Sequence, residues 1–259
     1  MVFVREKLKI FGLKLWSINE NYVEQAKKLY DNGVYDYIEL YSVPNSYNRF
    51  AKIWKSLEIP YIIHAPHFMS GLKLSKREFF ENNMILAEEA KRYADLLNAK
   101  FIIFHPGIDG DIDESIHQLN KIDDNRILVE NKPYYAVKEK LVCNGNSPEE
   151  IKHIMENTGV GFCLDIGHAI CAANTRKIEP MNYIKDFLKL NPNMYHLTDG
   201  QYESEKDRHD HFGKGNYDIK SILGIIPEPA TITIETYKDY QDSLDDFKED
   251  IMFLRNCLN

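Results

Sequence analysis

GFCLDIGHA, residues 161–169, is an apolar run that ends in Asp165, with His168 three residues further on. The apolar residues are continuous rather than alternating, which is typical of a parallel strand buried on both faces. Taken alone, Asp165 could cap a following helix, or it could bind a metal together with His168.

Seven further runs of this kind occur, each followed by a longer stretch with helical character. The expected strands are 9–16, 35–41, 60–66, 100–107, 126–133, 160–168, 193–200 and 230–237. The clearest helical patterns are 17–33, 76–99, 147–159 and 243–259, and Ser147 followed by Pro148 is a typical helix start.

Eight β/α units in 259 residues, without a low-complexity linker, predict an α/β fold with one domain over residues 1–259. The size and pattern are those of a closed (β/α)8 TIM barrel. A doubly wound open sheet is the alternative. It would more often carry a Gly-rich phosphate loop after its first strand, and FGLKLWSIN is not such a loop.

The composition makes several classes of protein less expected, without removing them. Lys plus Arg number 32 and Asp plus Glu number 40, so a net charge of −8 provides no general attraction to nucleic acid or anionic membranes. No run of 18 apolar residues predicts a membrane span, and the charged start MVFVREKLKI does not resemble a signal peptide. The four cysteines lack CxxC spacing and are expected to be reduced thiols. We therefore expect a cytoplasmic protein, with no prediction of its oligomeric state.

Imidazoles and carboxylates stand at the ends of six successive expected strands, where a barrel enzyme has its active site. They are His64, His105, Glu130, Asp165, His168, His196, Asp207, His209 and Glu235. Each has a structural alternative; Glu130, for example, could pair with Lys132 or Arg126. Carboxylates gathered in one barrel mouth would repel one another without cations, and His, Asp and Glu are ligands of zinc, manganese or iron. A metal site is therefore predicted.

The order HAP…HPG…EN…CLDxGHA…HLxD…DxHxxxGxG…ET resembles the xylose isomerase-like barrel superfamily, and within it the endonuclease IV (AP endonuclease family 2) branch. The resemblance implies three zinc ions held by the nine side chains above. His211 is a rival to His209, but the DxH spacing and Gly213 favour His209. Sugar isomerases and epimerases of the superfamily use a subset around one Mn, Co or Mg ion, here Glu130, Asp165, His196 and Glu235.

The resemblance predicts a metal-dependent hydrolase of phosphodiesters, abasic DNA among them, with Glu130 and Glu235 as catalytic residues. Lys132, Arg208 and Lys214 on the rim loops could contact substrate phosphates. Two departures argue against DNA: HAPHFMSG replaces the branch's Ser-Tyr-x-x-Asn continuation, and YSVPNSYNRF lacks an obvious DNA-inserting loop. The alternative is an isomerase or epimerase of a small sugar or sugar phosphate, with Glu130 and Glu235 as its acid–base pair. A metal-binding barrel that has lost its activity is a third interpretation.

Overall fold

The computed structural model describes residues 8–136 and 141–258, and its strands form a closed barrel in which all eight are parallel and follow the order of the chain. The last strand pairs with the first, with Leu13 beside Ile234. The strands are β1 (Lys9–Trp16), β2 (Tyr37–Tyr41), β3 (Tyr61–His64), β4 (Ile102–Phe104), β5 (Ile127–Glu130), β6 (Gly161–Asp165), β7 (Met194–Leu197) and β8 (Ala230–Ile234). The predicted TIM barrel is confirmed, and the open sheet is excluded.

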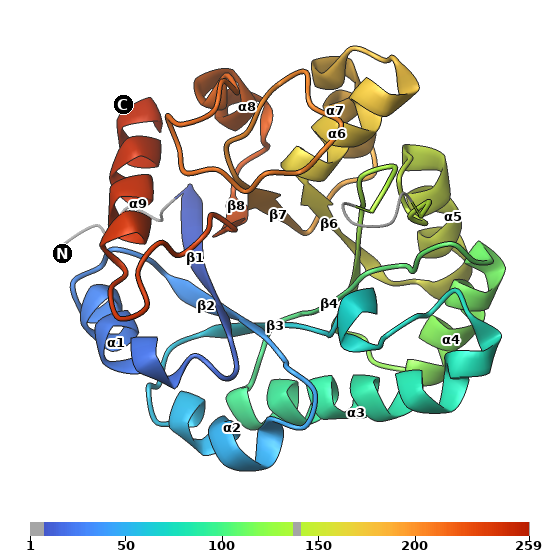
Figure 1. Cartoon of the computed structure of the whole chain (residues 1–259), viewed down its shortest axis with the longest axis horizontal. Coiled ribbons are helices and arrows are strands. Elements are labelled where there is room, and N and C mark those ends of the chain that lie inside the picture. The colour runs from blue at the N-terminus through green and yellow to red at the C-terminus, as the bar shows by residue number, and fades with distance from the viewer. Residues whose placement is uncertain (1–7, 137–140, 259) are drawn as a thin grey trace, which may run out of the picture.

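Helices surround the barrel on all sides (Figure 1). They are α1 (Val23–Asp31), α2 (Tyr47–Lys55), α3 (Phe80–Leu97), α4 (Ile112–Ile122), α5 (Pro148–Thr158), α6 (Ile166–Arg176), α7 (Pro180–Leu188), α8 (Ile219–Ile225) and α9 (Asp245–Leu258). The predicted start of α5 is confirmed, since the Ser147 side chain accepts a hydrogen bond from the Glu150 backbone nitrogen. Within the described residues, no helix combines the length and apolar character needed to cross a membrane.

Most strands are shorter than the runs that predicted them. The expected strand 160–168 is wrong at its end, because β6 stops at Asp165 and α6 begins at Ile166. The Asp165 side chain accepts a hydrogen bond from the His168 backbone nitrogen at 2.7 Å and so caps α6. His105 and Glu235 likewise follow the last residues of β4 and β8. The His105 and Glu235 side chains therefore stand at the rim of the barrel, just beyond the ends of their strands.

The inside of the barrel is built in layers. One cluster of buried side chains from six neighbouring strands lies apart from the main core: Tyr37, Ile62, Ile103, Leu128, Cys163 and Met194. Side chains two residues apart in a strand share a face. The next layer of inward-facing side chains, two residues further along each strand toward the rim, therefore contains Glu39, His64, His105, Glu130, Asp165 and His196. Gly12 leaves room for the Tyr37 ring, which a Cβ at that position would meet at 2.3 Å.

Candidate metal centre

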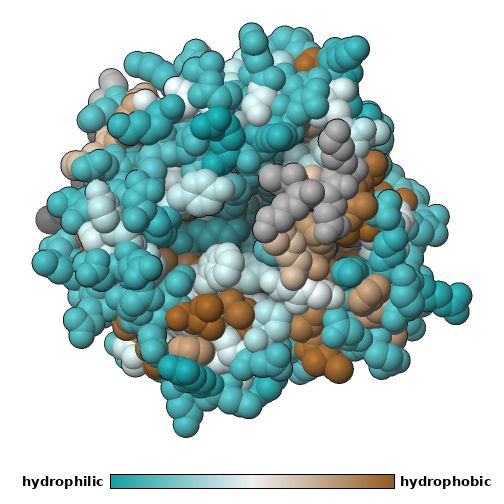
Figure 2. Space-filling model, in the orientation of Figure 1, coloured by the Kyte–Doolittle hydropathy of each residue, from teal (hydrophilic) through white to brown (hydrophobic). Residues whose placement is uncertain are grey.

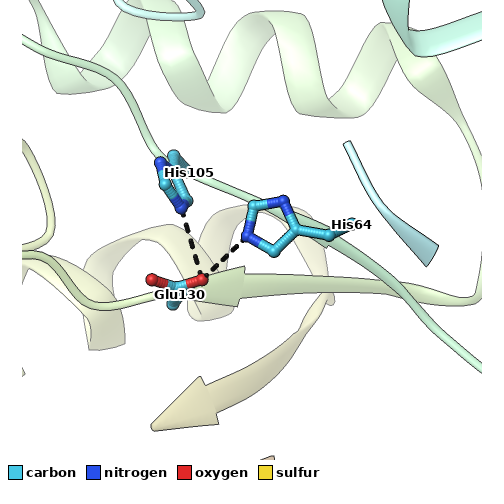
Figure 3. Close-up of side chains that lie close together, drawn as sticks. All are labelled: His64, His105 and Glu130. Carbon is cyan, nitrogen blue, oxygen red and sulfur yellow. Dashed lines mark hydrogen bonds and ion pairs between the residues drawn. The ribbon is translucent and has the colours of Figure 1, made fainter. Parts of the chain in front are cut away.

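Glu130 lies where several of the predicted ligands meet (Figure 3). Its Oε2 is 3.1 Å from His64 Nε2 and 3.3 Å from His105 Nε2. Its Oε1 is 3.1 Å from His168 Nδ1. The Glu130 side chain is 1% exposed, so both carboxylate oxygens are held among these rings away from solvent. One carboxylate of β5 thus connects side chains from β3, from the residue after β4 and from α6.

The remaining predicted ligands join the same cluster. His196 Nδ1 lies 2.8 Å from Glu235 Oε1 and 3.9 Å from Asp165 Oδ2. Asp207 Oδ2 lies 3.2 Å from His168 Nε2 and 2.7 Å from His209 Nε2. The structure therefore brings all nine side chains together, from parts of the chain as distant as residues 64 and 235.

Four of the five histidines among the predicted ligands share one orientation. In each, one ring nitrogen contacts an oxygen that is not a predicted ligand atom. These contacts are His64 Nδ1 to Ala65 O at 2.7 Å, His168 Nδ1 to Asn131 O at 2.9 Å, His196 Nε2 to Glu39 Oε2 at 2.8 Å and His209 Nδ1 to Glu235 O at 2.9 Å. An acceptor on one side keeps the ring proton there, so that the opposite nitrogen presents its lone pair. Metal-binding histidines are oriented in this way.

The opposite nitrogens of these rings face carboxylate oxygens. Such an arrangement is repulsive unless a second proton or a metal cation lies between the two groups. His196 Nδ1 is buried and, within the described residues, has no hydrogen-bond partner, although Glu235 Oε1 is close. Its position beside the carboxylates of Glu130, Asp165 and Glu235 suits the binding of a divalent cation. The residues therefore fit a metal, and nitrogen and carboxylate donors suit zinc or manganese.

Among residues 8–136 and 141–258, three groups of side chains have possible ligand atoms within 4.8 Å of one another: His64, His105 and Glu130; Glu130, Asp165 and His196; and Glu39, His196 and Glu235. Two of them share Glu130 and two share His196. Shared side chains of this kind suit a centre that holds more than one ion in a single cavity.

The electrostatic environment differs among the ligands. Burial, with repulsion from Asp207, raises the pKa of the Asp165 carboxyl to about 6. Burial opposes charge on His168, but the attraction of Asp165 and Asp207 outweighs it and raises the pKa of His168 to about 10. For His105, burial and the neighbouring Lys132 ammonium hold the pKa well below the usual value of histidine. This environment favours the neutral form of His105.

Two residues of the cluster were missed by the sequence reasoning. Lys14 of β1 contacts Glu235, and its Nζ is 3.1 Å from Glu39 Oε1. Glu39 of β2 is fully buried and also accepts a hydrogen bond from Thr233 Oγ1 at 2.6 Å. The signal was present, because KIFGLKLW and YDYIELY each place a charged residue inside an otherwise apolar strand pattern.

Of the three residues expected to contact substrate phosphates, one lies in the cluster and two do not. Lys132 lies inside the cluster, with Nζ 3.1 Å from Glu130 Oε1. Arg208 pairs with Asp210, and Lys214 lines a different cavity. His211, the rival of His209, turns away and binds Asp250 at 2.8 Å. His209 is thus the histidine of this loop that reaches the cluster.

A cavity of ≈480 Å³ opens above the ligands. Figure 2 shows this face of the molecule hollowed near its centre, with a hydrophilic floor and less polar residues around the rim. Several rim side chains are large and exposed, among them Trp16, Met69 and Tyr237. The Trp16 ring lies 5.3 Å from Tyr41, and the Tyr237 ring lies 5.7 Å from His209. A molecule that reaches the ligands must therefore pass between aromatic side chains.

Residues 22–257 match the model of one protein family, described as the xylose isomerase-like TIM barrel. The match spans most of the chain, from before the first helix to the last one. The chain belongs to this family.

Two kinds of relative are found. A probable endonuclease 4 from Mycobacterium ulcerans is 26% identical over 215 residues, covering 79% of this chain and 81% of the relative. Endonuclease IV from Thermus thermophilus superposes with a TM-score of 0.73 at 18% identity, covering 96% of this chain and 98% of the other. A D-tagatose 3-epimerase-like protein has a TM-score of 0.68 at 19% identity, covering 96% and 100%. The two structural matches show a shared fold, which serves both hydrolases and epimerases.

Proposed function

We propose that this chain is a metal-dependent hydrolase of phosphodiesters that uses a zinc centre of more than one ion. The orientation of the four histidines carries this proposal, because in their neutral form, the form that binds metal, it directs four imidazole lone pairs at carboxylates within one cavity. The relatives named as probable endonuclease 4 point to the same reaction class.

The number of ligands also favours the hydrolase. An isomerase of this family would need Glu130, Asp165, His196 and Glu235 around one ion. His64, His105 and the Asp207–His209 pair are surplus to that requirement, yet they are buried or half-buried and directed at the same cluster. Nine side chains, some of them bridging, can hold up to three zinc ions completed by water, because each zinc takes about four ligands.

When bound, divalent metal supplies Lewis acidity and a water molecule that is ionised near neutral pH. Glu130 presents one oxygen toward His64 and His105 and the other toward His168, and we assign it the role of orienting this water. Glu235 contacts the same nitrogen of His196 as Glu130 does, and it also contacts Lys14, which holds its carboxylate in place. The aromatic rim limits the access of bulk water.

One observation favours an isomerase or epimerase as the second candidate. Glu130, Asp165 and Glu235 surround a single nitrogen, His196 Nδ1, at 3.4, 3.9 and 2.8 Å. Two carboxylates on either side of one ion could exchange a proton with opposite faces of an enediolate. In that reaction Mn, Co or Mg would serve as well as zinc, and the substrate would be a small sugar or sugar phosphate.

A paired assay tests the two candidates. Metal-stripped protein is reconstituted with zinc, manganese or cobalt and given either an oligonucleotide with one abasic site or a panel of ketoses and their phosphates. The control is the Glu130→Gln variant prepared in parallel, which must be inactive if the activity belongs to this site. Cleavage of the oligonucleotide without turnover of any sugar supports the hydrolase. Sugar turnover without cleavage would replace it with the isomerase.

A further inference from the structure

The ammonium group of Lys132 lies among the predicted ligands. It follows β5, its backbone nitrogen donates to Gly145 O at 3.1 Å, and its side chain is 13% exposed. Its Nζ lies 3.1 Å from Glu130 Oε1, 3.2 Å from His105 Nε2 and 3.4 Å from both ring nitrogens of His168. The ammonium group therefore contacts three of the nine ligand residues at once.

The contact with His105 has a definite chemical meaning. A lysine ammonium has three donor hydrogens and no acceptor, so the facing nitrogen of His105 must provide its lone pair. An imidazole nitrogen has one lone pair in the plane of its ring. His105 Nε2 can thus accept from Lys132 or bind a metal, but it cannot do both.

The same competition applies to charge. A metal at the group of His64, His105 and Glu130 would approach these atoms to about 2.0–2.2 Å, and a neighbouring ammonium would repel it. Lys132 already supplies Glu130 with the positive charge that the metal would bring. Binding of the metal at this group therefore requires Lys132 to leave His105.

We propose that the Lys132 ammonium group competes with one metal ion for the group of His64, His105 and Glu130. This group therefore binds its metal with the lowest affinity of the centre and is filled last. This inference rests on the proposed metal centre and adds an order of loading to it. The ions held by the other ligands remain on the protein, whereas the ion at His105 is readily exchanged.

The test compares zinc binding by metal-stripped wild type, Lys132→Met and Lys238→Met. Lys238 is a matched control, since it lines the same cavity but donates to the backbone oxygen of Thr236 at 2.7 Å. Calorimetric titration gives the affinities, and elemental analysis after gel filtration in metal-free buffer gives the retained zinc. Circular dichroism establishes that each variant is folded.

Lys132→Met is expected to bind its weakest zinc ion at least ~10-fold more tightly than wild type and to retain about one more ion per chain, while Lys238→Met behaves as wild type. The double variant Lys132→Met/His105→Ala should lose this gain. Equal zinc number and affinity in wild type and Lys132→Met would overturn the role of Lys132 and leave the metal centre in place. Absence of zinc binding by both proteins would overturn the metal centre itself.

Discussion

Glu39 Oε2 lies 2.8 Å from His196 Nε2, at the bottom of the cluster where both side chains are fully buried. This contact keeps the ring proton of His196 on Nε2 and directs Nδ1 toward Glu130 and Glu235. Glu39 thereby sets the direction of a predicted ligand, His196, although Glu39 is not one of the predicted nine.

Glu39→Gln should weaken zinc binding by ~10–100-fold, because a neutral amide oxygen is a weaker acceptor for the Nε2 proton and makes the His196 ring less basic. Calorimetric zinc titration measures the effect. Glu228→Gln is the control, since Glu228 pairs with Lys9 away from the site. Unchanged affinity in Glu39→Gln would mean that His196 does not bind the metal through Nδ1.

Glu235→Gln should lower activity at least ~100-fold and leave the fold intact, because the last strand ends just before this residue and its carboxylate reaches the cluster. The loss is expected under either proposed reaction. The measurement is the initial rate at saturating metal, beside the surface variant Glu156→Gln as a control. A wild-type rate in Glu235→Gln would remove this residue from the active site.

His105→Ala should bind at least one zinc ion fewer than wild type at saturating zinc, with a large fall in activity. His105 Nε2 forms one candidate metal group with His64 and Glu130, and a zinc ion that loses one of three protein ligands is bound more weakly. Zinc stoichiometry is read from a calorimetric titration, with His117→Ala on the exposed side of α4 for comparison. A single zinc ion in both wild type and His105→Ala would contradict the multinuclear centre and favour the isomerase.

Trp16→Ala should raise the KM of the substrate by about 3- to 10-fold with little change in kcat, because the Trp16 ring lies at the rim and not among the ligands. Fluorescence provides a second measurement. Trp16 is 49% exposed, whereas Trp54, the other tryptophan of the chain, is fully buried. Substrate should therefore quench the wild-type emission and leave that of Trp16→Ala unchanged; a fall in kcat at constant KM would contradict this role.

Much of the barrel was evident in the sequence, because buried parallel strands need continuous apolar runs and the helices between them need one apolar face. The run 9–16 matches β1 in full. Residue types at the strand ends identified the nine candidate ligands, since a closed barrel directs all of these ends to one rim. The end of β6 was predicted poorly. Asp165 is the N-cap of α6 and also faces the cluster, and a pattern of apolar residues does not show where a strand ends and the next helix begins.

Other features depend on contacts between residues that are distant in the chain. Glu39 and His196 are 157 residues apart, and only closure of the barrel brings them to 2.8 Å. Lys132 was expected on a rim loop, but the turn after β5 directs its ammonium into the ligands. The sequence by itself determined which donors the barrel mouth contains. The tertiary structure decided which lone pairs are free and which already have a partner, because hydrogen-bond direction depends on positions in space that residue spacing does not contain.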